Sequence, residues 1–241
     1  MINIDEIKGI IFDYGGTIDS NGKHWAEVLW ESYQNNKIPV TKEQFREAYV
    51  YGERYLATNL VIMPEDNFQI LLKKKVDLQI KYLVDNGYLR KEDKSESYIV
   101  AVSDQCYNFV RNLISEEKPV LVDLHKKYPM VLVSNFYGNV NAVLRDFGIF
   151  ECFDSIIESA VVGVRKPDPA IFGLGVDELN MSAEEIVVIG DSHGKDIIPA
   201  TKTGCKTIWL KGLGWEKDDE NATADVVITN FMELKDVFQL K

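Results

Sequence analysis

Four sets of polar residues come directly after, or in the loop after, a short apolar run. They are Asp13; Ser134 with Asn135; Lys166; and Asp191 with Asp196. A carboxylate can act as a nucleophile, and carboxylate oxygens are ligands for Mg²⁺. A hydroxyl and an ammonium can stabilise the negative charge on the oxygens of a phosphoryl group during its transfer. The residue types therefore predict phosphoryl-transfer chemistry, provided that the fold brings the four sets together.

The apolar runs have the length and composition of buried strands. They are residues 9–12, 130–133, 155–157, 186–189, 206–210 and 225–228. Short, continuous, β-branched runs are typical of strands that are covered on both faces. Helical patterns lie between or after them, at residues 120–127, 139–147, 170–179, 196–203 and 231–240. This alternation predicts an α/β fold with a doubly wound, Rossmann-like parallel sheet, in which reactive groups collect at the carboxyl ends of the strands.

One long segment interrupts the alternation. Between residues 20 and 115 no buried strand is apparent, and apolar residues such as Trp25, Val28 and Leu29 recur at helical spacing. Helix breaks are expected near Pro39, Pro64, Gly87 and Pro119. We therefore expect an all-helical domain of residues 20–115, inserted into a core formed by residues 1–19 and 116–241.

The charge balance disfavours partners that need a basic surface. The chain has 27 Lys and Arg against 38 Asp and Glu, a net charge of −11, whereas nucleic-acid binding depends mainly on basic residues. The lysines at positions 73–75 are expected to form a solvated helix face. No apolar run approaches the length of a membrane span, and the three cysteines have no CxxC spacing. We expect a cytoplasmic protein that binds neither nucleic acid nor membrane; the oligomeric state is not predicted.

The four sets of residues resemble the four motifs of the haloacid dehalogenase-like (HAD) hydrolase superfamily, most of whose members are phosphatases. The resemblance extends over nearly the whole chain. It implies that Asp13 is the nucleophile that forms an aspartyl-phosphate, and that Ser134 binds the phosphate. It also implies that Lys166, in the segment Arg-Lys-Pro-Asp-Pro, stabilises the charge. The inserted segment resembles the helical cap that closes over a small phosphorylated metabolite in such enzymes.

The resemblance also implies a cofactor and further site residues. A Mg²⁺ ion is expected at Asp13, the backbone carbonyl of Gly15, Asp191 and Asp196, the last of which orients the cluster. Substrate contacts are expected from four residues: Gly16, Thr17, His24 and Asn135.

One position departs from the family pattern. HAD phosphatases carry Asp-x-Asp-Gly-Thr, whose second Asp protonates the leaving group, whereas this chain has Gly15 at that position. A positioned acid or base contributes roughly 10²–10⁴ in rate. Asp19 is not expected to replace the lost acid, because family members carry both acids; His193, within the fourth motif, is a further candidate, since histidine is a common general acid in catalysis. We expect slow hydrolysis of alkyl phosphates and less impairment with good leaving groups.

Other members of the superfamily also lack the second Asp. They include the haloacid dehalogenases, which need no metal, and the phosphonoacetaldehyde hydrolases, which need a cap lysine, for which Lys23 is a candidate. A non-catalytic phosphate-binding relative is a third alternative. The retained segment Gly190-Asp191-Ser192 and Asp196 favour an Mg²⁺-dependent phosphoryl enzyme over the dehalogenases, whereas the non-catalytic relative stays open to a test of turnover.

Overall fold

Six parallel strands form one sheet in the order β3-β2-β1-β4-β5-β6. They are β1 (Gly9–Phe12), β2 (Met130–Ser134), β3 (Ser155–Glu158), β4 (Ile186–Gly190), β5 (Lys206–Leu210) and β6 (Val226–Ile228). The structure is a computed structural model that describes residues 2–90, 95–212 and 222–240. Each strand coincides with one of the apolar runs, so the predicted α/β fold with a parallel sheet is confirmed.

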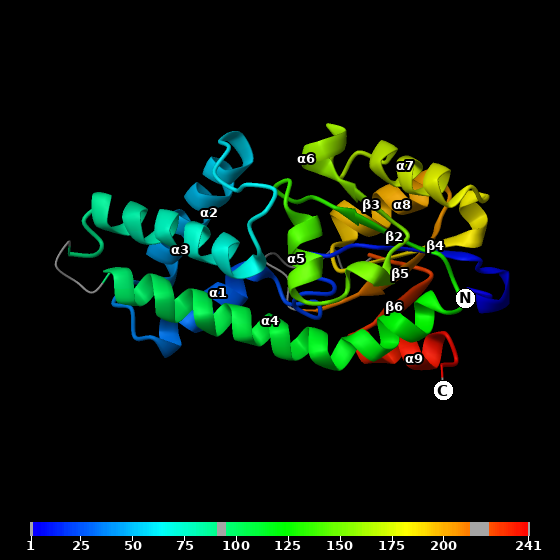
Figure 1. Cartoon of the computed structure of the whole chain (residues 1–241), viewed down its shortest axis with the longest axis horizontal. Helices are drawn as coiled ribbons and strands as arrows, with labels where there is room; N and C mark the ends of the chain where they lie inside the picture. Colours follow the sequence, from blue (N-terminus) through cyan, green and yellow to red (C-terminus); the bar gives the residue numbers. More distant parts are fainter. Residues whose placement is uncertain (1, 91–94, 213–221, 241) are drawn as a thin grey trace.

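Both faces of the sheet are covered by helices, which explains why the central strands β1 and β4 carry no polar side chain and are buried throughout. Ile10 and Phe12 of β1 face a core that includes α4 (Ser95–His125), α5 (Val140–Asp146) and α9 (Leu234–Val237). Ile11 faces a second core with α7 (Ala170–Leu179) and α8 (Ile198–Thr203). In Figure 1, α7 and α8 lie on one side of the sheet and α4 and α9 on the other. A short helix, α6 (Ser159–Val162), follows β3.

A helical insertion separates β1 from β2, as the sequence predicts. It contains α1 (Trp25–Asn35), α2 (Lys42–Thr58), α3 (Phe68–Asp85) and the first half of α4. The Thr41 side chain and Gln44 form a capping box at the start of α2, and the Asn67 side chain caps α3. α3 packs against both α2 and α4, and the four helices extend to one side of the sheet (Figure 1).

The helix break expected near Pro119 is wrong, because α4 continues through Pro119 to His125. Its buried residues include one stripe at three- and four-residue spacing that runs past the proline: Val102, Cys106, Val110, Ile114, Glu117, Val120, Leu121 and Leu124. A proline in a helix interior costs about 3 kcal/mol or more. Burying this continuous stripe offsets that cost, since each large apolar side chain contributes about 1.5–3 kcal/mol. One helix therefore crosses the expected domain boundary at residues 115 and 116.

The strand order places a crevice at the carboxyl end of β1. β1 lies at the centre of the sheet, and the chain proceeds outward to β2 and β3 on one side and to β4, β5 and β6 on the other. Such a switch of direction opens a crevice outside the carboxyl ends of the two central strands. Phe12 pairs with Ile189, so the residues after β1 and β4 emerge side by side. Within the described residues, no helix has the length and apolarity that crossing a membrane would need.

Candidate active site

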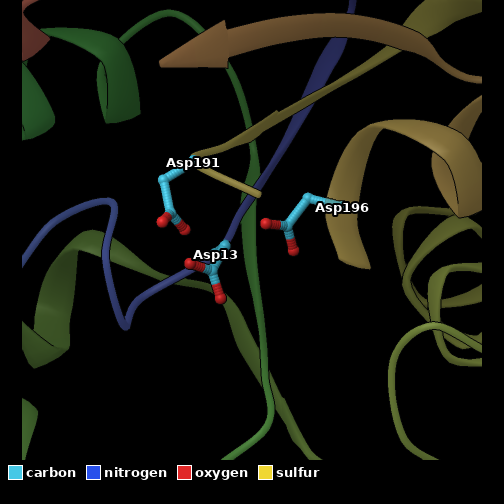
Figure 2. Close-up of side chains that lie close together, drawn as sticks. All are labelled: Asp13, Asp191 and Asp196. Atoms are coloured by element: carbon cyan, nitrogen blue, oxygen red, sulfur yellow. The ribbon is translucent and has the colours of Figure 1, made fainter. Parts of the chain in front are cut away.

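Three carboxylates meet in the crevice between β1 and β4. Asp13 follows β1, Asp191 follows β4, and Asp196 lies in the π-helical turn His193–Ile197 that comes next (Figure 2). One carboxylate oxygen of each lies within 4.8 Å of those of the other two. Because the strands are parallel and adjacent, segments almost 180 residues apart in the chain contribute to one cluster.

Lys166 supplies the positive charge beside these carboxylates. Its Nζ lies 2.5 Å from Oδ1 of Asp13 and 2.7 Å from Oδ1 of Asp196. The three side chains are almost completely buried. Burial lowers the pKa of Lys166, but the charges of Asp13 and Asp196 outweigh this effect and hold the pKa above its ordinary value. The ammonium therefore stays charged.

Burial has the opposite effect on the carboxylates. Removal from water raises the pKa of Asp13 to about 6, although the charge of Lys166 lowers it. Burial, followed by the negative charges of Asp13 and Asp196, raises the pKa of Asp191 well above its ordinary value. One lysine thus leaves this group of acids with an excess of negative charge, which a cation would relieve.

The loop after β1 holds Asp13 in place and brings its backbone against Asp191. The Thr17 hydroxyl donates a hydrogen bond to Oδ2 of Asp13 at 2.8 Å and lies 3.5 Å from Oδ1 of Asp191. Gly16 has a φ of +101°, and a Cβ there would fall 2.4 Å from the Asp191 carboxylate. Only glycine satisfies both conditions at position 16.

Gly15, in contrast, is not required by the backbone. Its φ is outside the left-handed region, and an added Cβ would find only Oδ2 of Asp19 nearby, at 4.0 Å. A Cβ at position 15 therefore meets no clash, and it would lie beside Asp19.

Asp19 is a buried acid that the sequence analysis set aside. Its Oδ1 accepts a hydrogen bond from the Gly16 backbone N–H at 2.7 Å, and its Oδ2 accepts one from Trp25 Nε1 at 2.8 Å. Burial raises the pKa of Asp19 to about 7. These bonds tie the loop after β1 to the start of α1. The other candidate acid, His193, places Nε2 at 3.1 Å from the carbonyl oxygen of Thr223 and packs against Trp209.

Ser134 and Asn135 end β2 beside this cluster. Ser134 is buried and lines the same cavity as Asp13. The Asn135 side-chain amide donates to the Lys166 carbonyl at 3.0 Å and accepts from the Lys166 N–H at 2.9 Å. The amide that we expected to contact substrate thus holds the backbone of Lys166 in this structure.

A cavity of about 910 Å³ opens over the carboxylates, between the sheet and the helical insertion. His24 lines it from the start of α1, where its Nδ1 caps the helix by accepting from the Ala26 N–H at 3.1 Å. Burial, followed by the charge of Lys195, lowers the pKa of His24 to about 4. The imidazole is therefore neutral, with its proton on Nε2.

The cavity also contains residues that the sequence analysis missed. Lys75 was expected on a solvated helix face, but it is only 6% exposed and lines the cavity with Glu53. The signal was its spacing in α3, since Lys75 falls on the buried stripe with Leu71, Leu72 and Gln79. Because three lysines are consecutive, the sequence pattern indicates one solvated face, and it does not distinguish the lysine that points inward from the other two.

The residues present fit a divalent cation. Asp13 and Asp191 offer the hard oxygen ligands that Mg²⁺ prefers, and Gly15 lines the same cavity with its backbone. Asp196 has both oxygens engaged, one with Lys166 and one accepting from the Ser192 N–H at 3.0 Å. Asp196 is thus arranged to orient the cluster.

Comparison with known proteins agrees with this arrangement. The haloacid dehalogenase-like hydrolase family model matches residues 7–204. The phosphoglycolate phosphatase of Photobacterium profundum is 30% identical over 249 residues, covering 100% of this chain and 99% of that protein. The phosphoglycolate phosphatase of Vibrio cholerae is 27% identical over 240 residues, covering 96% of each.

Solved structures show the same fold. A dehalogenase with an intermediate complex has a TM-score of 0.66 at 15% identity and covers 100% of both chains. The HAD-hydrolase YfnB from Bacillus subtilis, bound to magnesium, has a TM-score of 0.59 at 19% identity, covering 97% of this chain and 99% of its own. From the family match, the full-length relatives and the shared fold together, this chain belongs to the haloacid dehalogenase-like hydrolases.

Proposed function

We propose that this chain is a Mg²⁺-dependent phosphohydrolase that acts on a small phosphorylated metabolite through an aspartyl-phosphate on Asp13. The observation that carries the proposal is the buried ammonium of Lys166, in contact with Asp13 and Asp196 beside Asp191. A buried nucleophilic carboxylate, a fixed cation and a metal-binding pair of acids are the parts that phosphoryl transfer needs.

Asp13 attacks the phosphorus atom of the substrate. Lys166 and Thr17 fix its orientation, one on each carboxylate oxygen. As the new bond from a carboxylate oxygen to phosphorus forms, the bond from phosphorus to the ester oxygen breaks, and the leaving group takes that electron pair. Water then attacks the same phosphorus atom, which releases inorganic phosphate and restores the Asp13 carboxylate.

The surrounding residues bind and orient the phosphoryl group. The Ser134 hydroxyl and the Lys166 ammonium donate to its oxygens, where negative charge is concentrated in the transition state. Gly16 and His24 line the same cavity, and with Thr17 they would complete the contacts to the substrate. Asn135 acts as a positioning residue, because its amide fixes the backbone of Lys166.

Asp13, Asp191 and the Gly15 carbonyl would hold the Mg²⁺ ion, and Asp196 would orient them. When bound, the ion supplies positive charge that neutralises the carboxylates and the phosphoryl oxygens.

The glycine at position 15 makes the enzyme sensitive to its leaving group. An alkoxide must gain a proton as it leaves, and no side chain stands at the family position that supplies it. Aryl and acyl phosphates release stabilised anions and need little protonation. Such substrates should therefore react faster than alkyl phosphates.

The helical insertion, residues 20–115, would act as a cap that closes over the substrate and excludes bulk water. A cytoplasmic location fits the three cysteines, Cys106, Cys152 and Cys205, which are buried and form no disulfide.

The direct test is the hydrolysis of 4-nitrophenyl phosphate with and without Mg²⁺. We expect turnover that requires the ion, disappears on chelation, and is lost in Asp13→Asn. Phosphate binding without turnover would contradict the proposal and favour a non-catalytic relative. Metal-independent release of halide from 2-haloacids would favour a dehalogenase instead.

A further inference from the structure

An ion pair between a buried lysine and a half-buried glutamate lies on the side of the cavity that the helical insertion forms. The ammonium of Lys75, in α3, lies 2.8 Å from Oε1 of Glu53, in α2. The hydroxyl of Tyr137, in the loop after β2, donates to Oε2 of Glu53 at 2.8 Å. Lys75 also lies 5.3 Å from the centre of the Tyr137 ring. We call these three residues the distal cluster.

The distal cluster shares its cavity with the carboxylates of the phosphoryl site. Around it the insertion supplies aromatic and aliphatic walls, which are Trp25, Tyr49, Leu56, Phe68, Leu71 and Leu72. The volume of about 910 Å³ is ample for a phosphate ester with several carbons. A substrate whose phosphoryl group lies at Asp13 would therefore extend its remaining part toward these residues.

The ion pair keeps hydrogen-bonding capacity after its internal contacts are made. An ammonium has three donors, and a carboxylate has about four acceptor positions. Lys75 pairs with Oε1 of Glu53 and also interacts with the Tyr137 hydroxyl, which leaves at least one of its donors. Oε2 of Glu53 accepts from Tyr137, and Oε1 accepts no hydrogen bond among the described residues. Both a donor and an acceptor thus remain side by side. A hydroxyl group matches this pair, because it can accept from Lys75 while it donates to Glu53.

A carboxylate matches the pair poorly. It has no proton to donate, and the charge of Lys75 is already balanced by Glu53 at 2.8 Å. A second carboxylate at Lys75 would lie beside Glu53 and be repelled by it, with little solvent to screen the repulsion. The other Lys and Arg side chains among the described residues that line the cavity are Arg165, Lys166 and Lys195, all in core loops next to the phosphoryl site.

We infer that the distal cluster selects phosphate esters of hydroxylated, uncharged carbon chains, that is, polyol or sugar phosphates, over phosphate esters that carry a carboxylate. This inference rests on the proposed phosphohydrolase function and names its substrate class. It separates this chain from the relatives named phosphoglycolate phosphatase, because phosphoglycolate carries a carboxylate.

The test compares two substrates that differ in one group. Glycerol 3-phosphate and 3-phosphoglycerate share the phosphoryl group, the leaving oxygen and the middle hydroxyl, and differ only in a terminal CH₂OH or carboxylate. We expect wild-type kcat/KM to be about 10-fold or more higher for glycerol 3-phosphate, the value of about one charged hydrogen bond. A higher kcat/KM for 3-phosphoglycerate or for 2-phosphoglycolate would overturn the inference.

Variants show whether the ion pair causes the selectivity. In Glu53→Gln the charge of Lys75 is no longer balanced and can attract a carboxylate. The ratio of kcat/KM for glycerol 3-phosphate to kcat/KM for 3-phosphoglycerate should therefore fall about 10- to 100-fold. Lys73→Met removes a lysine of α3 that does not line the cavity, and it should leave the ratio unchanged. If Glu53→Gln lowers kcat/KM equally for both substrates, the distal cluster only joins the insertion to the core, and the inference fails.

Turnover of 4-nitrophenyl phosphate distinguishes a wrong substrate class from a wrong proposed function. If the wild type hydrolyses the aryl ester with Mg²⁺ but prefers 3-phosphoglycerate, only the substrate class is wrong. If the aryl ester is not hydrolysed either, the proposed phosphohydrolase function is contradicted.

Discussion

The ammonium of Lys166 lies 2.5 Å from Oδ1 of Asp13, although 153 residues separate the two in the chain. Both side chains are almost fully buried, and the same ammonium lies 2.7 Å from Asp196. A buried carboxylate is stable only when it is paired or protonated. Lys166 therefore keeps Asp13 ionised, as a nucleophile must be, and it is placed to contact the phosphoryl group that Asp13 attacks.

Lys166→Met should strongly reduce kcat while the protein still folds. We expect kcat for 4-nitrophenyl phosphate to fall about 10²–10³-fold, the effect of losing one charge-stabilising donor in a transition state. Circular dichroism of the same sample should show the native helix content. A variant that is folded and retains more than a tenth of the wild-type kcat would contradict the role of Lys166.

Gly15→Asp should restore an acid at the position where the family carries one. The structure has room for it, because an added Cβ meets only Oδ2 of Asp19 at 4.0 Å. We expect kcat/KM to rise about 10²-fold or more for alkyl phosphates and to change little for aryl phosphates, since only the former need protonation. The comparison uses glycerol 3-phosphate and 4-nitrophenyl phosphate. Without a gain on the alkyl ester, the explanation by a missing acid fails.

Asp191→Asn should weaken Mg²⁺ binding while the remaining carboxylates stay in place. Asp191 lies in the three-carboxylate cluster, and among the described residues it has no counter-ion as close as Lys166 is to Asp13 and Asp196. The Mg²⁺ concentration for half-maximal activity should rise about 10-fold or more, in keeping with the loss of a charged ligand. Titration calorimetry with Mg²⁺ should show the same weakening. If the wild type and Asp191→Asn bind Mg²⁺ with equal affinity, Asp191 is not a ligand of the ion.

Glu117→Gln tests a buried acid in α4. Glu117 is 1% exposed, and neither of its oxygens has a hydrogen-bond partner among the residues that the structure describes. Burial raises its pKa from 4.5 to about 9. The folded state therefore holds a proton that the unfolded state releases between about pH 5 and pH 9, so the free energy of unfolding falls as the pH rises through this range. Gln cannot ionise and removes this contribution.

Urea unfolding at pH 5.5 and pH 8.5 measures the effect. Relative to wild type, Glu117→Gln should be more stable at pH 8.5 than at pH 5.5 by at least about 1 kcal/mol. Glu116→Gln is the matched control, because Glu116 is exposed and adjacent in the same helix. If the two variants respond to pH in the same way, Glu117 is not the source of the dependence.

The sequence predicts those parts of the fold that depend on local patterns. The six strands coincide with short apolar runs, and the segments after four of them, β1 to β4, carry the polar residues that meet at the sheet edge. Pairing of β1 with β4 brings Asp13 and Asp191 together, because parallel neighbours end at the same edge. The order of strands and polar residues in the sequence could therefore indicate a site whose residues lie far apart in the chain.

Features that depend on tertiary packing could not be predicted in the same way. Pro119 marks a helix end by local rules, yet the buried stripe of α4 carries the helix through it. Tyr137 and Glu53 are 84 residues apart, and their hydrogen bond depends on how the insertion lies over the core. Asn135 has the residue type of a ligand contact, but its amide bonds to the backbone of Lys166 because the loop after β3 approaches β2.

The most direct measurement is the mass of the peptide that contains Asp13 after the enzyme reacts with an aryl or acyl phosphate. The sample is mixed with Mg²⁺ and substrate, quenched in acid within one turnover, and digested for mass spectrometry. The account predicts that this peptide gains the mass of one phosphoryl group in the wild type and not in Asp13→Asn. Turnover without such a gain, or a gain on any other residue, would contradict it.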